Sequence, residues 1–132
     1  MKENKIVYRC SQFSGMLLII AALVKAISIN NLVVGATTGD ISKHYATSVL
    51  IDWSFSCMLL SLIGIWILFL ARDLKNLQKR AWSQAVLIGL AFTLFGGGFW
   101  FRYPSSLHLP FFLLVGLLLL VPLLIYSRRF KQ

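Results

Sequence analysis

Residues 82–101 read WSQAVLIGLAFTLFGGGFWF and carry no charged side chain over twenty positions. The hydrocarbon core of a bilayer, about 30 Å thick, is crossed by a helix of about 20 apolar residues. A membrane-barrel strand is only about ten residues long and alternates apolar with polar side chains, a pattern that this stretch lacks. The segment therefore predicts a transmembrane α-helix.

Three further stretches have similar length and apolarity, at about 12–30, 46–70 and 107–126, and the first of them could extend through Asn30 and Asn31 to Val34. Of the 132 residues, 58% are hydrophobic and 13% are charged, which is about half the charged share of a soluble domain. So few polar side chains cannot cover so large an apolar surface, and a soluble globular monomer is excluded. We expect one all-α domain, residues 1–132, that forms an integral membrane four-helix bundle.

The basic residues predict the orientation of this bundle. Ten of the thirteen flank the predicted helices on one side: Lys2, Lys5, Arg9, Arg72, Lys75, Lys79, Arg80, Arg128, Arg129 and Lys131. Only Lys43 and Arg102 flank them on the other side. Because cytoplasmic loops carry an excess of Lys and Arg, both termini are predicted in the cytoplasm, with up-down-up-down topology. The link at about 30–45 is then the only outer segment with room to fold over the bundle.

The net charge of +9 would indicate nucleic acid in a soluble chain. Here the basic residues adjoin apolar segments, where contact with anionic headgroups accounts for them. We therefore expect the lipid bilayer as a partner and no nucleic acid.

Two ionisable residues of opposite charge lie inside the predicted spans, Lys25 in the first and Asp52 in the second. Each costs at least about 2.5–3.5 kcal/mol to insert, so such residues are candidates for a functional site. They lie at similar depth on consecutive helices, which predicts an ion pair between them. Each shares a helical face with small or hydroxyl residues, such as Gly15 and Ser56, which favours an orientation into the bundle.

The third segment contains the run Gly96-Gly97-Gly98 near its outer end. Such a run removes side-chain volume and is tolerated where the backbone lines a polar cavity. We predict a polar cavity open to the outer face, with the following lining residues: Lys25, Asp52, Ser56, Gly96, Gly97, Gly98, Arg102 and His108. The alternative is structural, with an ion pair, close helix packing at the glycines, and interfacial side chains that reach the headgroups.

Catalytic and metal-binding patterns are not found. The sequence has no GxSxG, P-loop, GxGxxG or HExxH motif. Its two cysteines form no CxxC pair, and its two histidines have no nearby partner ligands. We expect no cofactor and no metal, and the chain is not predicted to be an enzyme.

The run Ala21-Ala22-Leu23-Val24-Lys25-Ala26-Ile27, followed by an acid early in the second helix, resembles the DoxX-like superfamily of small four-helix membrane proteins. Members typically carry a Gly-rich segment that leads to the lysine and a glutamate in the second helix, whereas this chain has alanine in place of glycine ahead of Lys25 and has Asp52 in the second helix. The resemblance implies a membrane subunit associated with quinone or thiol redox systems.

The leading hypothesis is an accessory, non-catalytic subunit of a bacterial inner membrane, crossing it several times. Its outer cavity would bind a small molecule, a lipid or a quinone-type headgroup, and the protein would form a homo-oligomer or join a larger membrane complex. One alternative is a small proton-coupled transporter that uses Asp52 and Lys25. Another is a purely structural membrane scaffold.

Overall fold

The computed structural model describes residues 2–39, 42–102 and 108–130. In these residues the chain forms helices α1 (Lys2–Thr38), α2 (Lys43–Lys75), α3 (Lys79–Arg102) and α4 (His108–Ile125), followed by the short 3₁₀ helix η1 (Ser127–Phe130). The predicted all-helical fold is confirmed. Three helical stretches, Lys5–Thr38, His44–Lys75 and Lys79–Arg102, are long and apolar enough to cross a membrane, and Leu109–Ile125 is a shorter apolar helix.

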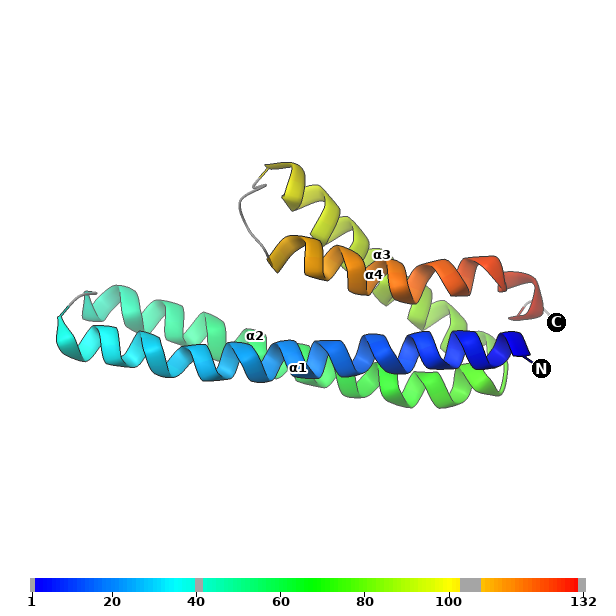
Figure 1. Ribbon diagram of the computed structural model, residues 1–132, viewed down its shortest axis with the longest axis horizontal. Coiled ribbons are helices and arrows are strands. Elements are labelled where there is room, and N and C mark those ends of the chain that lie inside the picture. The colour runs from blue at the N-terminus through cyan, green and yellow to red at the C-terminus, as the bar shows by residue number, and fades with distance from the viewer. Residues whose placement is uncertain (1, 40–41, 103–107, 131–132) are drawn as a thin grey trace.

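The helices pair as two antiparallel hairpins, α1 with α2 and α3 with α4 (Figure 1). Helices of 37 and 33 residues in the first hairpin face helices of 24 and 18 residues in the second. At 1.5 Å per residue, the first hairpin is about 50–55 Å long and the second about 27–36 Å. We call the end where α1 begins and α2 joins α3 the base, and the end where α1 joins α2 the tip. The α1–α2 hairpin therefore continues alone toward the tip.

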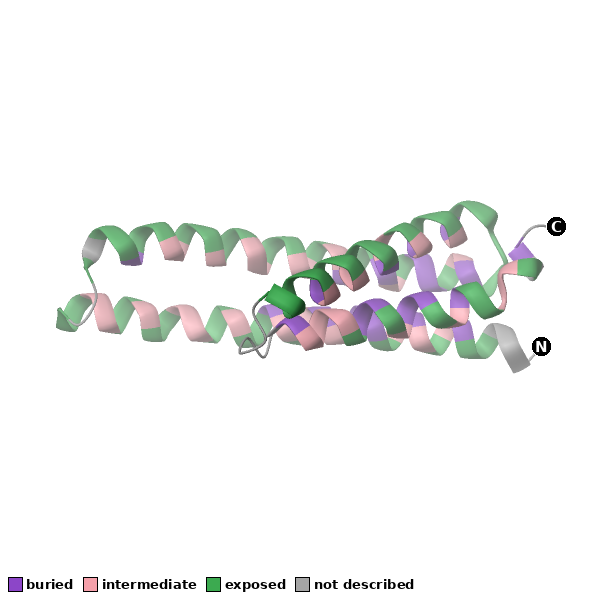
Figure 2. Ribbon diagram, turned by 90° about the horizontal axis from the view of Figure 1, so that it is seen from above, coloured by how far each residue is buried: buried purple, intermediate pink, exposed green. Residues whose placement is uncertain are grey.

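The buried core lies in the base half, where all four helices meet (Figure 2). Three helices, α1, α2 and α4, contribute its most fully enclosed large apolar side chains: Val7, Leu18, Ile67, Leu74, Val115, Leu119 and Leu123. α3 contributes the small buried side chains of Ala81 and Ala85. Phe130 of η1 is also buried, and its ring stacks on Trp82 at a centroid distance of 6.4 Å. The two hairpins are thus joined through the base, while the tip half of α1 and α2 has few buried side chains.

Close backbone contact holds each hairpin together. A Cβ atom added to Gly15 would lie 2.8 Å from the carbonyl oxygen of Gly64, and the reverse distance is also 2.8 Å. In the second hairpin, a Cβ on Gly116 would lie 2.6 Å from the backbone nitrogen of Thr93. Small residues let helices approach in this way, which gives van der Waals packing that lipid tails cannot replace.

The link expected at about 30–45 is helical over most of its length, which corrects that prediction. α1 continues through Asn30 and Asn31, both exposed, and the first positive φ follows at Gly39, at 85°. The hydroxyl oxygen of Ser42 accepts a hydrogen bond from the backbone N–H of Tyr45, 3.4 Å away, and so caps α2. Exposed asparagines cost a helix little, so the helix ends only at the left-handed glycine, and no long segment is left to fold over the bundle.

Candidate functional site

Lys25 is partly buried on α1, facing α2. Its ammonium nitrogen lies 5.8 Å from the centroid of the Trp53 ring. The negative face of an indole attracts a cation at this distance, by about 0.5–2 kcal/mol depending on desolvation. Trp53 is therefore a contact of the predicted site that spacing alone did not reveal.

Asp52 adjoins Trp53 in sequence, but its side chain is exposed. Successive residues of an α-helix are turned by about 100°, so the carboxylate leaves the helix on a different side from the indole that Lys25 contacts. Both residues are described by the structure, and they do not form the expected ion pair. The contact between Lys25 and Trp53 places Lys25 and Asp52 at a similar level along their helices, as the spacing predicted. The direction of the Asp52 side chain differs from the prediction.

The Ser56 hydroxyl donates a hydrogen bond to the backbone carbonyl oxygen of Asp52 at 2.7 Å. This is a bond to the preceding turn of the same helix, and it leaves the Asp52 carboxylate uninvolved. Ser56 thus lies beside Asp52, as its spacing predicted, with its proton used within α2.

The three glycines of the predicted cavity lie in different surroundings. Gly96 is buried against α4, and an added Cβ would collide with the backbone of Leu113 and lie 2.9 Å from the carbonyl oxygen of Leu109. A Cβ on Gly97 would lie 3.5 Å from the Leu113 side chain, and one on Gly98 would have nothing within 4 Å. Close helix packing, the structural alternative, therefore accounts for Gly96 but not for its two neighbours.

The remaining predicted residues flank the link between α3 and α4. Arg102 is exposed at the last position of α3. His108 is the first residue of α4, and its side chain lies outside the described residues. The predicted set is thus divided between the hairpins, with Lys25, Asp52 and Ser56 on the first and the others on the second, and a common cavity stays a prediction.

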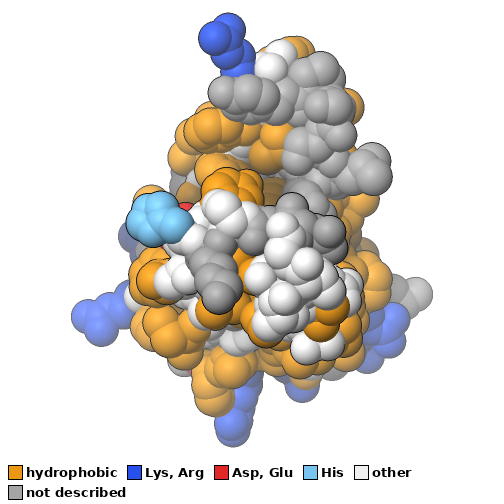
Figure 3. All heavy atoms as spheres, turned by 90° about the vertical axis from the view of Figure 1, so that its left-hand side faces the viewer, with side chains coloured by type: hydrophobic (Ala, Val, Ile, Leu, Met, Phe, Trp, Pro, Cys, Tyr) orange, Lys and Arg blue, Asp and Glu red, His pale blue; other side chains and the backbone are white. Residues whose placement is uncertain are grey.

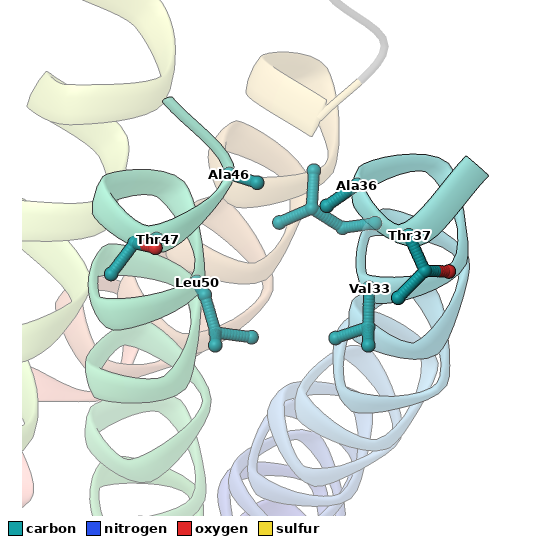
Figure 4. A pocket seen from close by; sticks show the side chains of 7 residues that line it. Val33, Ala36, Thr37, Ala46, Thr47 and Leu50 are labelled. Atoms are coloured by element: carbon teal, nitrogen blue, oxygen red, sulfur yellow. The ribbon is translucent and has the colours of Figure 1, made fainter. Parts of the chain in front are cut away.

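Two pockets in the described part of the chain are lined by residues outside the predicted set. One, of about 270 Å³, lies between α1 and α2 near the tip, and its wall is formed by Leu32, Val33, Ala36, Thr37, Ala46, Thr47 and Leu50 (Figure 4). The other, of about 240 Å³, lies between α2 and α3 and is lined by Leu62, Ile63, Trp66 and Ile88. Both are mainly apolar, and neither could be found from sequence because each needs the relative placement of two helices.

Among the described residues at the tip, charged side chains are few (Figure 3). Viewed from that end, the described surface is largely hydrophobic or neutral, with Lys and Arg side chains at the periphery (Figure 3). Among the described residues, no three His, Cys, Asp or Glu side chains gather as a metal site would require.

Comparison of the chain with protein-family models, with curated proteins and with solved structures gives no match in any of the three.

Proposed function

We propose that this chain is a multi-pass protein of a bacterial inner membrane that acts as an accessory, non-catalytic subunit and binds a polar headgroup on the outer side. The apolar helices support this class. Large hydrophobic side chains are exposed on all four of them, among them Ile20, Phe69, Leu87 and Ile125. Lipid is the environment in which such side chains are stable on an outer surface.

The exposed basic residues at the base, which include Lys5 and Arg72, suit the cytoplasmic side. With that orientation, a hydrocarbon core about 30 Å thick corresponds to about 20 residues of helix. Twenty residues separate Lys5 from Lys25 on α1, and twenty separate Arg72 from Asp52 on α2. Both charges of the candidate site then lie at the outer boundary of the core, where lipid and quinone-type headgroups are found.

The observation that carries the proposal is that Lys25 and Asp52, at this shared depth, do not neutralise each other. The Lys25 ammonium lies over the Trp53 ring, and the Asp52 side chain is exposed. Each charge is then available to a polar ligand group of opposite sign. The DoxX-like resemblance is consistent with such a ligand and adds quinone-type headgroups to the class.

Native mass spectrometry of the protein in a mild detergent, with an absorption spectrum of the same sample, tests the proposal. We expect a bound species of small mass that is lost in Lys25→Gln and kept in Lys5→Gln, which removes an exposed base lysine instead. A wild-type chain without bound species, or equal retention in the two variants, contradicts headgroup binding. Proton flux into liposomes that is abolished by Asp52→Asn would assign the transporter alternative instead.

A further inference from the structure

Tyr8 lies at the base, partly buried in the seam between α1 and α2. It precedes Gly15, which contacts α2 directly, by seven residues, so both residues face α2. The ammonium nitrogen of Lys75, the last residue of α2, lies 5.6 Å from the centroid of the Tyr8 ring. The side-chain amide of Gln12 donates a hydrogen bond to the Tyr8 hydroxyl oxygen at 2.8 Å. Side chains of both helices thus meet at one phenol group.

The Tyr8 hydroxyl still has a proton to donate. A phenol hydroxyl donates one hydrogen bond and also accepts. Its oxygen accepts from Gln12, whereas none of the described residues accepts the Tyr8 proton. Lys75 is exposed, and so is Arg72, its neighbour one turn earlier on the surface of α2. Tyr8, Arg72 and Lys75, which we call the base cluster, therefore present hydrogen-bond donors to an occupant.

The base cluster is positively charged. Neither Arg72 nor Lys75 forms an ion pair with a described carboxylate. Asp73, the acid described at this end of α2, precedes Lys75 by two residues, which is about 200° around the helix axis, so it lies on the other side. Two cations and a hydroxyl donor suit a phosphate group, because its oxygens accept charge-assisted hydrogen bonds.

An apolar surface continues from the base cluster toward the tip. Gly15 of α1 and Gly64 of α2 are in backbone contact. Because the helices are antiparallel, the residue after each glycine turns to the same side of this contact, which places Met16 and Ile65 on one side of the seam. Their side chains are 54% and 44% exposed. Arg72 lies two turns from Ile65 toward the base, on the same side of α2.

We propose that the base cluster binds the phosphate of an anionic phospholipid in the leaflet around the base. Tyr8, Arg72 and Lys75 donate to the phosphate oxygens. An acyl chain lies along Met16 and Ile65, and these apolar contacts favour a lipid over a free phosphate ion. A head without an amine, as in phosphatidylglycerol, binds best, because an amine would face two cations. The site goes beyond the proposed function, which concerns a headgroup at the other end of the bundle.

Lipid retention measured by native mass spectrometry tests the head. Delipidated wild-type protein is mixed with equal amounts of phosphatidylglycerol, phosphatidylethanolamine and phosphatidylcholine of the same acyl chains. We expect phosphatidylglycerol to bind about tenfold more tightly than the others, roughly the effect of one charge-assisted hydrogen bond. Equal or stronger retention of either other lipid overturns the proposal. Inorganic phosphate at the concentration of the lipid should not displace it, and displacement would overturn a lipid as the occupant.

Variants of equal net charge separate the base cluster from the general attraction of a basic protein for anionic lipid. Arg72→Gln and Lys75→Gln should each weaken retention of phosphatidylglycerol about tenfold. Arg128→Gln removes an exposed charge from η1, outside the cluster, and should leave retention unchanged. Equal weakening by Arg72→Gln and Arg128→Gln would show that net charge alone attracts the lipid, and would overturn the cluster.

Removal of one hydroxyl group tests the third donor. Tyr8→Phe keeps the ring beneath Lys75 and should weaken retention of phosphatidylglycerol by a factor of about two to ten, the loss of one hydrogen bond. Tyr126→Phe, the matched change beside the end of α4, should have no effect. Unchanged retention in both Tyr8→Phe and Lys75→Gln overturns the cluster.

The same samples separate this inference from the proposed function. Phosphatidylglycerol should stay bound in Lys25→Gln, and the outer species should stay bound in Lys75→Gln. Loss of phosphatidylglycerol in Lys25→Gln together with its retention in Lys75→Gln overturns the base cluster and leaves outer headgroup binding intact. A protein that retains phosphatidylglycerol through the base cluster but no species that depends on Lys25 supports this inference and contradicts the proposed function.

Discussion

Leu77, in the short link between α2 and α3, adopts a φ of 59°, in the left-handed region. The backbone N–H of Gln78 donates to the carbonyl oxygen of Asp73 at 3.2 Å, and that of Leu77 donates to the carbonyl oxygen of Leu74 at 3.1 Å. This is the Schellman arrangement that ends many helices, and its left-handed position is usually glycine. A leucine there carries the steric cost of a Cβ atom close to its own carbonyl oxygen.

Leu77→Gly should therefore raise the free energy of unfolding by about 0.5–1 kcal/mol, since the relief of backbone strain exceeds the added flexibility of the unfolded chain. Leu87→Gly, in an exposed helix interior, should lower it by about 1 kcal/mol. Equilibrium unfolding in mixed detergent micelles, followed by circular dichroism, gives both values. A destabilised Leu77→Gly variant would show that the leucine side chain contributes more than its backbone costs.

The contact between α3 and α4 depends on which glycine faces the partner helix. Within one run of three, Gly96 is against the Leu113 backbone and Gly98 has open space beside it. Gly96→Ala should lower the free energy of unfolding by about 1–3 kcal/mol, because a Cβ has no room there. Gly98→Ala should leave it unchanged or raise it by up to about 1 kcal/mol, the difference in helix propensity. Equal effects of the two substitutions in the same unfolding assay would contradict this helix contact.

A second contact between α3 and α4 lies at the base of their hairpin. The indole N–H of Trp82 donates to the backbone carbonyl oxygen of Leu123 at 3.0 Å. Leu123 lies in the last turn of α4, where carbonyl groups lack partners within the helix. Trp82 thus satisfies a carbonyl group at the end of α4.

At the scale of the molecule, the sequence predicted the helical class well because uninterrupted apolar runs of this length have few other interpretations. It placed the first two helices too short, since polar pairs such as Asn30-Asn31 lower hydropathy without ending a helix. The site was less predictable. Spacing gives the depth of Lys25 and Asp52 along their helices, but their facing depends on how α1 and α2 are rotated against each other. Likewise, Gly96 and Gly98 belong to the same run of glycines, and only the position of α4 determines that Gly96 has no room for a Cβ atom while Gly98 does.

The division between a shared core at the base and a lone hairpin at the tip predicts uneven local stability. Backbone amides in the tip half of α1 and α2 should exchange with deuterium faster than those around Leu18 and Ile67, because opening there exposes little buried surface. Hydrogen–deuterium exchange with peptide-level mass spectrometry in micelles measures this. Uniform protection along both helices would show that the tip is held by contacts beyond those within the chain.

The unequal lengths of the hairpins also bear on the thickness of the membrane around them. α4, with 18 residues, spans about 27 Å, somewhat less than a typical hydrocarbon core, whereas α1 and α2 exceed it by about 20 Å. If the base is anchored at one membrane surface, as the proposed function has it, a thin bilayer matches α4 and leaves the tip standing well clear of the opposite leaflet. A thick bilayer strains α4 and draws the tip back toward the headgroups. Hydrophobic mismatch would thus set how far this protein reaches beyond its own membrane.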